Sequence, residues 1–159
     1  MFRRSMALAV VGTLLAMRTS AAIACSFAPG YEAFLPGPVM RPSPTLAPAP
    51  AVSVEGIRRG TNGDPGMCAD AGVLVLKVPR AAQGYSFELV EGRFDDQVFP
   101  QGFVQPTRPG YLTFVWLDGN TDAQEPIGVV VKVTAISSLG VLSEPLLLKI
   151  EHPGRGRVR

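Results

Sequence analysis

Short apolar runs recur through residues 51–152, and each is bounded by glycine, proline, asparagine or aspartate. The runs are rich in valine, leucine, isoleucine and aromatic residues, which favour strands, and no useful window in this part of the chain shows an apolar 3.6-residue period. The pattern predicts a strand-rich domain with little helix. Seven strands are expected: Ala51–Arg58, Gly72–Val78, Tyr85–Glu91, Gln97–Val104, Tyr111–Leu117, Ile127–Ile136 and Leu146–Glu151.

Alternation within the runs indicates which strand faces are buried. Tyr85, Phe87 and Leu89 fall on one face of their strand, and the serine and glutamate between them fall on the other. The runs VLVL and GVVVKV are apolar on both faces, which suits central strands. Seven short strands at this spacing predict an all-β domain, an antiparallel two-sheet sandwich of immunoglobulin or fibronectin type III kind.

The closing stretch PIGVVVKVTAISSLGVLSEPLLLKI resembles the last two strands and the intervening turn of fibronectin-III-like domains. It departs from that family at Val129–Val133, where a tyrosine is usual, and Trp116 lies in a later strand than the family tryptophan. The start at Cys25, followed by a proline-rich segment, is similar to small bacterial secreted proteins with immunoglobulin-like domains. The resemblance implies a sandwich fold and an exported location.

Residues 1–24 have the layout of a secretory signal peptide. Arg3 and Arg4 supply the positive start, Met6–Met17 is a small and apolar run, and Ala22-Ile23-Ala24 offers a cleavage site just before Cys25. We therefore expect an exported protein, periplasmic or extracellular, and the sequence does not distinguish the general secretory route from the twin-arginine route.

Residues 25–50 form a proline-rich leader ahead of the predicted domain at residues 51–152. Proline fixes φ and removes a backbone donor, so the leader should be extended and neither helical nor a central strand. We expect it to lie over the domain or to project from it. Its prolines beyond residue 35 are Pro36, Pro38, Pro42, Pro44, Pro48 and Pro50.

The two cysteines, Cys25 and Cys68, allow two interpretations. In an oxidising compartment we expect them to form a disulfide. Alternatively, Cys25 becomes the N-terminal residue after cleavage and carries a lipid, which would make the protein an outer-membrane lipoprotein. Ala22 stands where a lipoprotein signal prefers leucine, and an even cysteine count favours the disulfide.

The charge balance argues against nucleic acid as a partner. Loss of Arg3, Arg4 and Arg18 with the signal leaves twelve of the fifteen basic residues against thirteen acidic ones. Several of the remaining basic residues lie in residues 153–159, which we expect to be a flexible basic tail. The folded body therefore lacks the positive surface that nucleic-acid binding requires.

The residues needed for common catalytic and metal sites are scarce. His152 is the one histidine and lies beyond the last predicted strand, so a histidine-based catalytic site is not expected. No cofactor motif is present. Asp118, Asn120 and Asp122 alternate as in the first half of a calcium loop, but the second half is missing, and an ordinary turn is the favoured interpretation.

Aromatic side chains are the remaining candidates for ligand contact, namely Tyr85, Phe99, Phe103 and Tyr111. We expect an exported, non-catalytic β-sandwich that acts in binding or structural presentation in the cell envelope. Its partner would be an envelope protein or a glycan, with membrane attachment only through a lipid on Cys25. The alternative functions are a lipoprotein and a carbohydrate- or calcium-binding module.

Overall fold

A computed structural model describes residues 28–37, 45–61, 71–80, 83–94, 98–118 and 124–154 of the chain. These residues contain strands and no helix, so the all-β prediction is confirmed for them. The eight strands are β1 (Tyr31–Ala33), β2 (Ser53–Arg58), β3 (Ala71–Lys77), β4 (Gln83–Glu91), β5 (Val104–Pro106), β6 (Tyr111–Leu117), β7 (Ile127–Ser137) and β8 (Leu146–His152).

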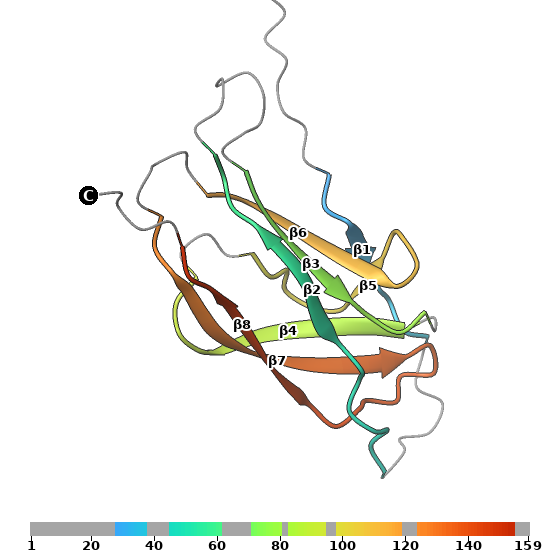
Figure 1. Cartoon of the computed structure of the whole chain (residues 1–159). Coiled ribbons are helices and arrows are strands. Elements are labelled where there is room, and N and C mark those ends of the chain that lie inside the picture. Colours follow the sequence, from blue (N-terminus) through green and yellow to red (C-terminus); the bar gives the residue numbers. More distant parts are fainter. Residues whose placement is uncertain are drawn as a thin grey trace, which may run out of the picture.

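The strands form two antiparallel sheets (Figure 1). One sheet has five strands in the order β1-β5-β4-β7-β8, and the other has three in the order β2-β3-β6. Figure 1 shows β2, β3 and β6 in one layer over β4, β7 and β8, with β1 beside β5 at one side. Strand alternation sends every second side chain into the space between the layers.

The core is a single cluster of apolar side chains from both sheets. Leu112, Phe114 and Trp116 occupy alternate positions of β6, and all three are buried. The Phe114 ring meets the Phe87 ring of the opposite sheet edge to face, with the ring centres 5.2 Å apart. Burial of these side chains stabilises the sandwich by about 1.5–3 kcal/mol for each large residue. The other large buried core residues include Leu74, Leu76, Tyr85, Val131, Val133 and Ile150.

The predicted strand Gln97–Val104 is wrong over most of its length. Residues 98–103 are a loop, and β5 begins only at Val104. Pro100 cannot donate a ladder hydrogen bond, and Gly102 has φ near 82°, so the backbone turns away from strand geometry. The apolar residues that suggested a strand pack into the core from the loop, since Val98 is buried and Phe99 packs against the cluster.

The leader supplies an eighth strand that the sequence did not predict. β1 pairs with β5, with Tyr31 opposite Pro106 and Ala33 opposite Val104. The Tyr31 ring lies 5.2 Å from that of Phe114, so the leader also contacts the three-stranded sheet. β1 therefore covers the side of the sandwich where the edges of β5 and β6 meet.

Several sequence predictions lie outside the described residues. These are the signal peptide at 1–24, both cysteines, Asn120, Asp122 and all of the basic tail beyond Gly154. Within the described part of the chain, no helix has the length and apolar character needed to cross a membrane.

Candidate functional site

Asp118, the first member of the possible calcium loop, forms a buried ion pair with Arg59. Asp118 follows β6 and Arg59 follows β2, so the pair joins the two edge strands of the three-stranded sheet at one end of the sandwich. Arg59 Nε donates to both carboxylate oxygens, at 2.9 and 2.8 Å. Both side chains are almost fully buried, with 7% and 4% of their surfaces exposed.

Further donors saturate the same carboxylate. The Gly60 amide and the Gln124 side-chain amide donate to Oδ2 at 2.6 and 3.0 Å, and Trp116 Nε1 donates to Oδ1 at 3.1 Å. Burial by itself raises the pKa of the Asp118 carboxyl, but the hydrogen bonds from Arg59, Gly60 and Trp116 and the Arg59 charge outweigh it. The pKa therefore lies below its ordinary value, and Asp118 is held as a carboxylate.

This cluster also holds the segment that leads into β7. Arg59 Nη1 donates to the Glu125 carbonyl at 2.8 Å, and Gln124 Nε2 donates to the Gly60 carbonyl at 2.9 Å. Both Asp118 oxygens thus accept protein donors, and Asn120 and Asp122 are not described. Among the described residues, no three histidine, cysteine or acidic side chains gather as a metal site would require. The chemistry that these contacts support is an interior ion pair that ties β2, β6 and the start of β7 together.

Tyr85, one of the four aromatic candidates, is enclosed in the core with none of its surface exposed. Its hydroxyl accepts a hydrogen bond from Gln83 Nε2 at 2.6 Å. Burial raises the pKa of the Tyr85 hydroxyl, and the Gln83 hydrogen bond offsets part of that rise. A ligand at the protein surface cannot reach this ring, which serves as packing between the sheets.

The other three aromatic candidates are partly exposed and lie in separate surroundings. Phe99 packs among the rings of Phe87 and Phe114, with centres 5.5 and 5.1 Å away. The Phe103 carbonyl accepts a hydrogen bond from the leader amide of Phe34 at 2.8 Å. Tyr111 lies under the Arg108 guanidinium, 5.5 Å from its ring centre. Within the described regions, no ring contact joins any two of the four candidates.

At the other end of the sandwich, the leader contacts the turn between β7 and β8. The Gly37 amide donates to the Ser138 carbonyl at 3.1 Å, and the Ala47 amide donates to the Leu142 carbonyl at 2.9 Å. The Glu144 amide donates a hydrogen bond to the Ala47 carbonyl at 2.7 Å. The turn includes residues 137–140, and Gly140 takes the left-handed conformation there with φ near 77°. Leader and turn thus form one hydrogen-bonded surface.

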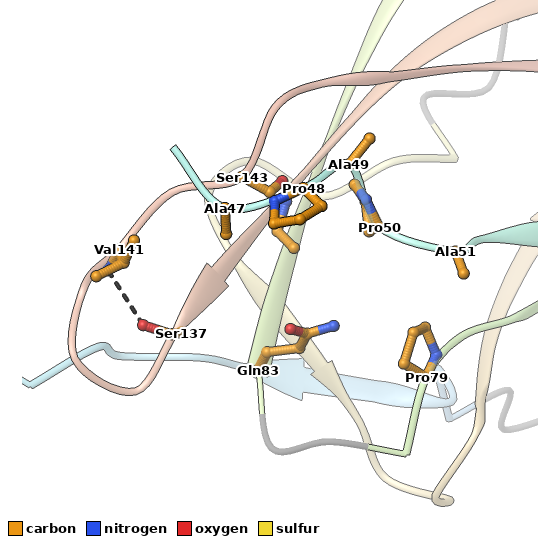
Figure 2. A pocket seen from close by; sticks show the side chains of 11 residues that line it. Ala47, Pro48, Ala49, Pro50, Ala51, Pro79, Gln83, Ser137, Val141 and Ser143 are labelled. Atoms are coloured by element: carbon orange, nitrogen blue, oxygen red, sulfur yellow. Dashed lines mark hydrogen bonds between the residues drawn. The ribbon is translucent and has the colours of Figure 1, made fainter. Parts of the chain in front are cut away.

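A partly open hollow of about 290 Å³ lies beside this surface (Figure 2). Figure 2 shows residues 47–51 along one rim, with Pro79 and Gln83 facing them and Ser137 and Val141 at the end. The lining is mostly alanine and proline, with Gln83, Ser137 and Ser143 as the polar side chains. The Ser143 hydroxyl is used internally, since it accepts from the Ala135 amide and donates to the Glu144 carbonyl, both at 2.9 Å.

Four exposed leucines lie within two residues of the backbone hydrogen bonds between the leader and the turn. Leu139 in the turn is 75% exposed and Leu35 in the leader is 88% exposed. Leu46 and Leu142 are also exposed; Leu46 precedes Ala47 in the chain, and the Leu142 carbonyl accepts the hydrogen bond from the Ala47 amide. Exposed apolar side chains that gather in one region are typical of contact surfaces. We call residues 35–37, 45–51 and 137–144 together the turn end.

Sequence reasoning missed the turn end because its leucines lie in the leader and between two predicted strands. A leucine at the tip of a four-residue turn was the available indication, since turn tips usually carry polar residues or glycine. Leu35 and Leu139 lie at the same end of the sandwich because the leader forms hydrogen bonds with the β7–β8 turn. The periodicity of the sequence does not indicate that the leader and this turn are in contact.

No protein-family model matches the chain, and neither does any curated protein or solved structure. Its function is therefore inferred from its own residues.

Proposed function

We propose that this is an exported, non-catalytic β-sandwich of fibronectin type III kind, which acts by binding an envelope protein or glycan through its turn end. Export is supported by the signal layout of residues 1–24. The observation that carries the binding proposal is the set of exposed leucines held around one turn by the leader.

The strand order supports the assignment of the sandwich to the fibronectin type III kind. When β1 is set aside, the other seven strands can be numbered along the chain. The three-stranded sheet then has the order first, second, fifth, and the other sheet has the order fourth, third, sixth, seventh. That is the arrangement expected of a fibronectin type III domain, and β1 would be an addition at the edge of its fourth strand.

The use of the buried polar residues supports a non-catalytic role. Arg59 and Gln124 hold the ends of β2 and β6, and Ser143 holds the β7–β8 hairpin. A catalytic group must keep a polar atom available to a substrate. These side chains instead donate to or accept from neighbouring parts of the fold.

Site-specific photocrosslinking in the producing cell tests the proposal. A photoreactive residue replaces Leu139 at the turn end. In a matched control variant it replaces Leu117, the last residue of β6, whose surface is 71% exposed. We expect a discrete adduct, with an envelope protein or with glycan, from position 139 and none from position 117.

Equal labelling from both positions, or none from either, would contradict binding through the turn end. Steady turnover of a substrate by the purified protein, lost on substitution of a single polar residue, would contradict the non-catalytic assignment. The two outcomes are independent, so each part of the proposal fails separately.

A further inference from the structure

β8 is the last strand of the five-stranded sheet and pairs with β7 on one side only. It is seven residues long, and in the described part of the chain no strand pairs with its other edge. The other edge strand of this sheet is β1, which has three residues, so β8 is the longer edge strand. A long edge with free backbone donors and acceptors is a template for another strand.

The charges on β8 select which strand can pair with it. Lys149 and Glu151 lie two residues apart on the outer face, are largely exposed, and contact each other at 2.7 Å. Leu147, on the same face, is 65% exposed. A lysine on an edge usually discourages pairing, because an arbitrary strand does not neutralise it. An antiparallel strand that places a glutamate opposite Lys149 and a lysine opposite Glu151 neutralises both charges.

We propose that β8 pairs antiparallel with β8 of a second copy of this chain, about a twofold axis at Ile150. Lys149 then lies opposite Glu151 of the second copy, and Glu151 lies opposite Lys149 of the second copy. Opposite charges directly across an antiparallel pair are favourable, and like charges are unfavourable. The two five-stranded sheets become one continuous sheet.

The neighbouring symmetric registers are worse. An axis at Lys149 sets that lysine against itself, and an axis at Leu148 sets Glu151 opposite Pro145, which has no amide hydrogen to donate. In the Ile150 register the strand overlap is Leu148–His152, five residues in each copy. An overlap of this length gives a dimer whose population rises with protein concentration.

Sedimentation velocity on the purified mature chain over a range of concentrations tests the pairing. We expect a dimer of the unaltered protein, and mainly monomer for Lys149→Glu and for Glu151→Lys, because each single reversal creates two like-charge pairs. An equimolar mixture of the two variants should again form dimers, since a copy with two acidic side chains at these positions then faces a copy with two basic ones. Lys77→Glu, an exposed reversal at the end of central strand β3, serves as the control and should leave the dimer intact.

A monomeric unaltered protein at all concentrations would overturn the proposal. So would a dimer that survives both single reversals, which would place the contact elsewhere, or a mixture of the two variants that stays monomeric. Matching thermal unfolding of the variants and the unaltered protein establishes that the reversals act on association and not on folding. The crosslinking result at Leu139 does not depend on any of these outcomes.

Discussion

The Arg59–Asp118 pair shows that the partners of an aspartate can differ from those its neighbours in the sequence suggest. Asp118 begins an alternating Asp-x-Asn-x-Asp stretch, which resembles half a calcium loop. In the structure its carboxylate accepts from Arg59, Gly60, Trp116 and Gln124. The sequence does not reveal this use because Arg59 lies 59 residues away, at the end of another strand.

Replacing Arg59 should be costly because it leaves a buried carboxylate without its counter-charge. We expect Arg59→Met to lower the free energy of unfolding by about 3–5 kcal/mol. The matched control is Lys132→Met, which breaks the exposed pair of Lys132 with Glu88 and should cost less than about 1 kcal/mol. Urea unfolding of both variants measures the difference, and similar losses would show that the interior pair has no special weight.

The lowered pKa of Asp118 predicts acid sensitivity. A folded-state pKa below the unfolded value means that the unfolded chain takes up the proton more readily, so this contribution to stability is present above the unfolded pKa of about 3.8. It is lost as the pH falls from that value through the folded pKa. Chemical unfolding from pH 6 to pH 2 should show this loss in the unaltered protein and a shallower one in Asp118→Asn. Parallel curves would contradict the assignment.

Gly72 illustrates a packing constraint at the residue scale. A Cβ atom placed on Gly72 would overlap the Trp116 ring on the neighbouring strand β6. We expect Gly72→Ala to destabilise the fold by about 1–3 kcal/mol through overpacking. Gly56→Ala on β2, where nothing lies within 4 Å of the added carbon, is the control and should be close to neutral. Thermal unfolding followed by circular dichroism compares the two, and equal melting temperatures would refute the constraint.

At the scale of the elements, strands with regular alternation were predictable and the leader was not. β3, β6, β7 and β8 match the predicted runs closely, because side-chain alternation and length suffice to define them. β1 was not predicted because three residues carry no period, and its pairing with β5 joins segments over 70 residues apart. The loop at residues 98–103 looked like a strand because loop residues can also be apolar when they fill the core.

Phe34 holds the leader against the outer face of β4. Its ring lies over Gly84, where a Cβ would overlap it, and this packing depends on the bare glycine backbone. Because the ring is half-buried, we expect Phe34→Ala to lower stability by about 1–2 kcal/mol and to expose the leader to protease. Leu35→Ala, at a neighbouring side chain that is 88% exposed, is the control and should change neither property. Limited proteolysis with mass mapping of the cleavage sites distinguishes them.

At the scale of the whole molecule, the proline-rich leader does more than precede the sandwich. Its described residues, 28–37 and 45–50, supply an edge strand, contact both sheets, and form hydrogen bonds with the β7–β8 turn. Its two docking points bring Leu35 and Leu46 to the turn that carries Leu139 and Leu142. The all-β class was predictable from the sequence, whereas this end depends on the path of the leader. The pairing or lipidation of Cys25 stays a prediction.

Amide hydrogen–deuterium exchange of the leader tests the central claim, that the leader is part of the fold and forms the turn end. The amides of Gly30, Phe34, Gly37 and Ala47 donate to the carbonyls of Thr113, Phe103, Ser138 and Leu142 respectively. We expect these four amides to exchange markedly more slowly than an unstructured chain of the same sequence. Exchange of all four at the unstructured rate, with β7 still protected, would contradict the account.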